Sequence, residues 1–151
     1  MKQIIETWEI NNKIVLYLLN SIDEKHLTSI SLSKGRTVAE HFAHIHNVRL
    51  MWLKEGFPEL LTSVEKIEKE NKTKKNITEQ LMKSGKAISE MLEKALGEGK
   101  LRGFKPHPTA FLGYIISHES HHRGQIVLCL KQSGHPVDKK VLFGLWEWGT
   151  K

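Results

Sequence analysis

The sequence predicts an all-α protein, an up-down bundle of four helices in a single domain over residues 1–151, with a short aromatic C-terminal tail. Apolar residues recur at steps of three and four along four long segments, as the core-facing side of a helix requires. No segment alternates apolar and polar residues between turn signals, as a half-buried strand would. Because each helix must cover its apolar stripe, four such segments favour a bundle around one core.

The first helix is predicted over residues 2–19. Its apolar positions are Ile4, Ile5, Trp8, Val15, Leu16, Leu18 and Leu19. After a loop, the second helix is predicted to begin at Thr37, because Thr37 and Glu40 have the spacing of a capping box. It continues to about Glu55 and ends in the segment Gly56–Pro58, since proline cannot continue a helical hydrogen-bond ladder.

The third helix is expected to begin in the segment Asn76–Glu79, which again has the form of a capping box. Its predicted end is the segment Gly97–Gly99, because glycine is the usual residue after the last helical turn. The fourth helix is predicted over residues 109–133, and Pro108 suits its first turn, where no backbone N–H is needed.

Composition and the N-terminal residues favour a protein that is neither membrane-spanning nor exported. The chain is 39% hydrophobic and 26% charged, and no apolar run approaches the ~20 residues that span a bilayer. The N-terminal residues lack the apolar stretch of a signal peptide. The single cysteine, Cys129, is expected in the core and forms no internal disulfide. We therefore expect a water-soluble, cytoplasmic protein without a membrane partner.

The positive charge of the chain does not indicate a nucleic-acid partner. Lys and Arg exceed Asp and Glu by 23 to 17, but the excess is diffuse. Its densest stretch, Glu65–Lys75, interleaves glutamates with lysines and contains no aromatic residue or arginine to stack on bases or grip phosphates. We interpret this stretch as a solvated linker and expect no nucleic-acid binding.

The segment His118–Gln125 reads HESHHRGQ and holds three of the nine histidines. At about 100° per residue, His118 and His122 lie inside the apolar stripe of the fourth helix, whereas His121 lies at its margin and favours the surface. Imidazoles one turn apart can bind one metal ion through two ring nitrogens. The alternative is a pair of core histidines that bond to backbone or water, and periodicity leaves both interpretations open.

His118, Glu119 and His122 also have the H-E-x-x-H spacing of the zinc metalloproteases. In that interpretation Glu119 would act as general base on a metal-bound water, and its place beside the stripe is compatible with this role. The extended motif fails, however, because Gln125 and Leu128 stand at its Gly and His positions, and no strand is predicted to bind a substrate. The sequence therefore argues against a protease.

The second helix could supply a third metal ligand, since facing helices of a bundle commonly build metal sites from inward side chains. Its histidines are His41, His44 and His46. Their positions around the helix do not choose among them.

Two motifs resemble the DinB-like family, also called DinB/YfiT-like, of four-helix proteins. Thr37–Ile45 matches the second-helix pattern T-V-x-x-x-x-A-H-I, and His118–Gln125 matches the fourth-helix pattern H-x-x-H-H-R-G-Q. The closing segment Leu145–Gly149 also resembles a tail found in family members. The match extends over essentially the whole chain. The family is named for DNA-damage-inducible expression and is unrelated to the translesion polymerase that shares the name, so the resemblance implies no DNA binding.

The resemblance implies a three-histidine site at His44, His118 and His122 that binds one divalent metal ion, often zinc or nickel. Related members include thiol transferases that use bacillithiol or mycothiol and a mycothiol-dependent maleylpyruvate isomerase, and several are homodimers. The implied function is a metal-dependent S-transferase that joins an electrophile to a metal-activated low-molecular-weight thiol, in a homodimer. A non-catalytic metal-binding stress-response module and a metal-dependent hydrolase are the alternatives.

The remaining polar residues around the two motifs have no assigned catalytic role. They are His41, His46, His121 and Gln125.

Other side chains near the fourth-helix motif carry structural predictions. Tyr114 is expected to pack, and Gly124 to allow a close approach of two helices. Arg123 lies about 140° around the helix from His118, which favours an ion pair or a subunit contact. Trp146 and Trp148 of the tail are expected to cap the bundle.

Overall fold

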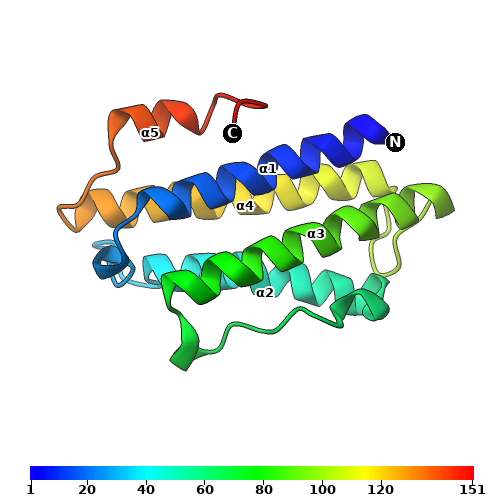
Figure 1. The fold of residues 1–151 in the computed structure, drawn as a ribbon, viewed down its shortest axis with the longest axis horizontal. Helices are drawn as coiled ribbons and strands as arrows, with labels where there is room; N and C mark the ends of the chain where they lie inside the picture. The colour runs from blue at the N-terminus through cyan, green and yellow to red at the C-terminus, as the bar shows by residue number, and fades with distance from the viewer.

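The computed structural model describes residues 1–151 and places four long helices side by side (Figure 1). They are α1 (Lys2–Ser21), α2 (Val38–Gly56), α3 (Lys74–Glu98) and α4 (Pro108–Gln132). The short elements are the 3-10 helices η1 (Glu24–His26), η2 (Pro58–Leu61) and η3 (Lys69–Asn71), and the helix α5 (Lys139–Gly144). The predicted all-α bundle is confirmed. No helix combines the length and the apolar character that crossing a membrane would require.

The helix directions follow the order up, down, down, up. Figure 1 shows α1 and α4 running one way and α2 and α3 the other. The connection over residues 57–73 returns along the bundle before α3 begins, so α2 and α3 are parallel. Because α2 and α4 are antiparallel and in contact, the early part of α2 lies beside the later part of α4.

Two apolar clusters fill the two halves of the bundle, and a buried polar layer lies between them. The layer includes a fully buried residue from each long helix, namely Asn11, Arg49, Ser84 and Glu119, and α2 adds His46 beside Ser84. These residues hydrogen-bond to one another, as buried polar groups must. The apolar core therefore has two parts, whereas the four apolar segments predicted one core, because every long helix places polar residues at inward-facing positions between the clusters.

The helix ends follow local signals in the sequence. Thr37 and Glu40 form the predicted capping box, with each side chain accepting from the other residue's backbone N–H. Helix α3 begins earlier than predicted, because Thr73 is its N-cap and accepts from the backbone N–H of Asn76. It ends at Gly99, whose φ of 71° lies in the left-handed region that favours glycine.

The charged segment over residues 65–75 is mostly exposed, as predicted for a linker, but it is fixed to the bundle at Ile67. The side-chain amide of Asn47 on α2 donates to the Ile67 carbonyl and accepts from its N–H.

The tail departs from the prediction. Helix α5 lies along the side of the bundle rather than over its end (Figure 1). Gly144 packs against the Tyr17 ring of α1, so the chain that follows stays beside α1 and α4. Trp146 is 83% exposed and Trp148 42% exposed, and neither caps the bundle.

Candidate metal centre

Helices α2 and α4 bring three predicted site residues together. One ring nitrogen from each of His44, His118 and His122 lies within 4.8 Å of the others. The Nε2 atoms of His44 and His118 are 3.3 Å apart. His122 is buried, whereas His44 and His118 are half-buried, so solvent reaches the group from one side.

The three imidazoles are neutral at neutral pH because the fold lowers the pKa of each. Burial is the largest cause for all three. It lowers the pKa of His122 to about 3, with the neighbouring His118 and His44 adding to the effect. A neutral imidazole offers a nitrogen lone pair that a protonated ring lacks. The group therefore presents three nitrogen donors at the pH of a cell.

A divalent metal ion fits this donor set. Two ligands that sit ~2.1 Å from one ion in tetrahedral geometry are a little over 3 Å apart, close to the observed Nε2 separation of 3.3 Å. The other nitrogen of His118, Nδ1, is buried without a hydrogen-bond partner. The His118 ring is thus directed only by its Nε2 side, toward His44.

His41 contacts a site residue without joining the group. Its Nδ1 lies 3.0 Å from Nδ1 of His122. One of the two nitrogens must donate, so the bond orients the His122 ring and leaves Nε2 of His122 for a ligand. Burial lowers the pKa of His41 to about 4, with Arg36 and His44 contributing, so this ring is also neutral.

The other polar residues left open by the sequence lie outside the group. His121 is exposed, in agreement with its predicted surface position. His46 is buried on the α3 side, where Nδ1 lies 3.0 Å from Ser84 Oγ and Nε2 lies 2.7 Å from the Glu65 carbonyl oxygen. Gln125 is half-buried, and its side chain makes no hydrogen bond within the chain.

Glu119 does not face the histidines. Both carboxylate oxygens are held in the polar layer, Oε1 by Arg49 Nε at 2.7 Å and Oε2 by Arg49 Nη2 at 3.0 Å. Asn11 Nδ2 also donates to Oε2, at 2.7 Å. The carboxylate therefore accepts hydrogen bonds from three donors and cannot act as the general base of a metalloprotease. Glu119 of the H-E-x-x-H spacing instead belongs to the buried polar layer.

Arg36, just before α2, is a site neighbour that sequence reasoning missed. Its side chain is exposed. It lies close enough for its charge to lower the pKa values of His41, His44 and His118, after the larger effect of burial. An exposed cation near the group attracts an anionic ligand.

An aromatic cluster flanks His118. Trp52, Phe104, Phe111 and Tyr114 pack with ring centroids 5.2–5.9 Å apart. The Tyr114 ring lies nearly parallel to His118, with centroids 6.5 Å apart. Tyr114 is 39% exposed, so it packs as predicted and also offers part of its surface beside the histidines.

On the opposite side of α4, the prediction for Gly124 is wrong. Of the two alternatives for Arg123, the ion pair is absent within the chain and the subunit contact stays a prediction. Arg123 forms no ion pair within the chain, since its guanidinium donates to Asn11 Oδ1 at 2.8 Å and to Ser120 Oγ at 2.7 Å. Gly124 does not lie at a close helix contact, because a β-carbon there would meet no atom within 4 Å. The tail leaves a space over this side of α4.

Comparison with known proteins agrees with the motifs. The model of the DinB family matches residues 1–142. The crystal structure of a DinB-like protein from Bacillus cereus ATCC 10987 has a TM-score of 0.72 to this one, at 20% sequence identity, over 91% of this chain and 95% of that chain. That likeness shows a shared fold. No curated protein sequence matches with significance. The family match covers nearly the whole length, so this chain belongs to the DinB family.

Proposed function

We propose that this protein is a metal-dependent S-transferase, in which His44, His118 and His122 hold one zinc or nickel ion and the second substrate is a low-molecular-weight thiol such as bacillithiol. The observation that carries the proposal is the group of three neutral imidazole nitrogens within 4.8 Å of one another, open to solvent on one side. Three protein ligands with an open position are typical of catalytic rather than structural zinc sites.

When bound, the ion would supply a positive charge that lowers the pKa of a thiol at its open side, making a nucleophilic thiolate available at neutral pH. The chain's own residues bind and orient. His41 holds the His122 ring through the Nδ1 to Nδ1 bond. Arg36 offers an attractive charge to an anionic thiol, and the exposed part of Tyr114 offers a surface for an organic group.

The alternative of a hydrolase is less well supported, because a hydrolase that activates water also benefits from a general base at the metal. The nearest candidate in sequence, Glu119, has both oxygens bonded to Arg49 and Asn11. A thiol has a lower pKa than water, so it needs no such base once a metal ion binds it.

The alternative of a purely structural metal site conflicts with the packing. Both apolar clusters take residues from all four long helices, and the polar layer forms its own hydrogen bonds, so the helices pack together without a metal ion. We therefore expect the bundle to keep its helices when metal is removed, whereas a structural zinc domain would unfold.

A thiol-dependent conjugation assay tests the proposal. The zinc- or nickel-loaded protein is mixed with bacillithiol or cysteine and monochlorobimane, and the fluorescent conjugate is measured. We expect turnover that requires both metal and thiol, is lost in His122→Ala and is retained in His121→Ala, the exposed neighbour. A metal-loaded protein without turnover supports the non-catalytic alternative, and thiol-independent cleavage of an ester supports the hydrolase.

A further inference from the structure

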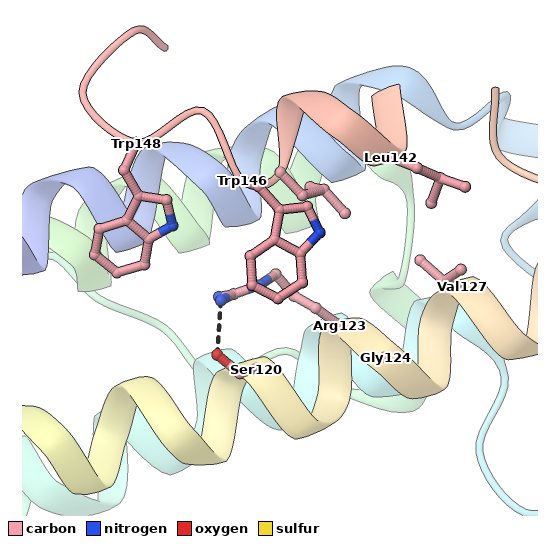
Figure 2. Close-up of a pocket in the computed structure, with 8 residues that line it drawn as sticks. Ser120, Arg123, Gly124, Val127, Leu142, Trp146 and Trp148 are labelled. Atoms are coloured by element: carbon pink, nitrogen blue, oxygen red, sulfur yellow. Dashed lines mark hydrogen bonds between the residues drawn. The ribbon is translucent and has the colours of Figure 1, made fainter. Parts of the chain in front are cut away.

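A pocket lies on the side of α4 opposite the histidines. It encloses about 440 Å³ between α4 and the tail. Figure 2 shows its two walls, with Trp146 and Trp148 reaching from the tail toward α4, Trp146 beside Arg123, and Leu142 opposite Val127. Small-molecule sites in proteins have volumes of about 300–1,000 Å³, so the pocket is large enough for a small organic ligand.

The lining is apolar with one cation. Its apolar residues are Val127, Leu142, Leu145, Trp146 and Trp148. The polar contribution comes from Ser120 and from Arg123, the only charged residue of the lining. Two indole rings beside an arginine present flat surfaces for a planar molecule and a charged donor for its polar end.

The charge of Arg123 has no counter-ion in the structure. Its two hydrogen-bond partners, Asn11 Oδ1 and Ser120 Oγ, are both neutral. The adjacent acid, Glu119, is paired with Arg49 in the polar layer. A guanidinium has five N–H groups, and hydrogen bonds to Asn11 and Ser120 use two of them, so three make no hydrogen bond within the chain. Burial is the largest cause that lowers the pKa of Arg123, and the charge of Glu119 opposes it only in part.

Gly124 keeps the base of the pocket open. Glycine inside a helix costs about 1 kcal/mol relative to alanine, so a packing or functional reason is expected for it. Close packing is not the reason, because a β-carbon at Gly124 would meet nothing within 4 Å. A larger side chain there would project into the pocket that Gly124 lines.

We infer that this pocket binds a small organic anion, with a planar apolar body between the α4 side chains and the two tryptophans and a carboxylate on Arg123. The site is separate from the histidine group, and its ligand is a different molecule from the thiol proposed there.

The test uses 2-naphthoate as the probe and 2-naphthamide as its neutral match. The four indole N–H signals of the full-length, zinc-supplemented chain are followed by nuclear magnetic resonance. We expect 2-naphthoate to shift the Trp146 and Trp148 signals with a Kd of about 1 mM or tighter, while the signal of buried Trp8 stays fixed. The amide should bind at least about tenfold more weakly, because it lacks the charge-assisted bonds to Arg123.

Two variants locate the site. Gly124→Leu should abolish binding of both probes by filling the pocket, while Gly124→Ala should keep it, and neither replaces a packed side chain. Arg123→Gln should remove the preference for the acid over the amide.

Several outcomes would overturn the inference. One is the absence of indole shifts at about 10 mM probe, and another is equal affinity for acid and amide. A third is unchanged binding in Gly124→Leu. Shifts of the Trp146 and Trp148 signals with protein concentration alone would also overturn it, because they would show a second copy of the chain in the pocket.

Discussion

Replacing Glu119 by glutamine tests whether this residue supports the fold or catalyses a reaction. The change keeps the size of the side chain and removes its charge. It leaves the fully buried Arg49 guanidinium without a counter-ion. It also turns one carboxylate oxygen into an NH₂ group that faces donors of Arg49 or Asn11, which then cannot both be satisfied.

The expected loss of stability is large. Glu119 accepts three hydrogen bonds, two of them in the ion pair with Arg49. Removing one partner of a buried ion pair costs about 3–5 kcal/mol, against a total stability of about 5–15 kcal/mol for a typical domain. With a urea m-value of about 2 kcal/mol/M, the midpoint should fall by about 1.5–2.5 M.

Urea unfolding followed by circular dichroism measures this shift. Glu90→Gln is the matched control, because Glu90 is exposed on α3 and makes no ion pair or side-chain hydrogen bond. The double variant Arg49→Met with Glu119→Met should recover much of the loss, since it removes both charges together. A midpoint change of Glu119→Gln below about 0.5 M, combined with lost catalysis, would refute this reasoning and restore Glu119 as a catalytic base.

Three further predictions concern His41, His46 and Arg36, which lie around the histidine group or on the same helix. His41→Phe should weaken metal binding about 10- to 100-fold in a competition titration with a chelator, and equal weakening by His121→Phe would contradict the role of the His41–His122 bond. The metal-free chain should lose stability as pH falls from 6.5 toward about 4, because the pKa of His46 is lowered from 6.5 to about 4 and the unfolded state takes up protons first. Unfolding midpoints that stay constant over this pH range would contradict the predicted loss of stability. Arg36→Gln should raise KM for an anionic thiol more than for cysteamine, and an equal change for both would exclude electrostatic attraction.

The long helices and most of their ends could be predicted because their signals are local. Thr37 and Glu40 are three residues apart, and Gly99 directly follows the last turn of α3. The polar layer could not be predicted in the same way. Arg49 occupies an inward-facing position, four residues after buried Ile45, but its partner Glu119 is 70 residues away in the chain. Such a pairing follows only from the way the helices pack.

Part of the metal site could be predicted because its signal is also local in the sequence. His118 and His122 are one helical turn apart, so their common face follows from the sequence. The choice of His44 came from family resemblance, because rotation of α2 about its axis decides which of its histidines faces α4. That rotation places His46 against Ser84 and His41 against His122. The pocket between α4 and the tail depends on where the tail packs, and no local sequence pattern specifies that position.

The central claim is that one divalent ion binds His44, His118 and His122. Equilibrium dialysis of the chelator-treated protein against zinc or nickel at near-neutral pH, followed by elemental analysis, tests it most directly. We expect about one equivalent of metal in the wild-type chain and in His121→Ala, and a small fraction of that in His122→Ala. Less than about a tenth of an equivalent in the wild-type chain, or full occupancy in His122→Ala, would contradict the claim.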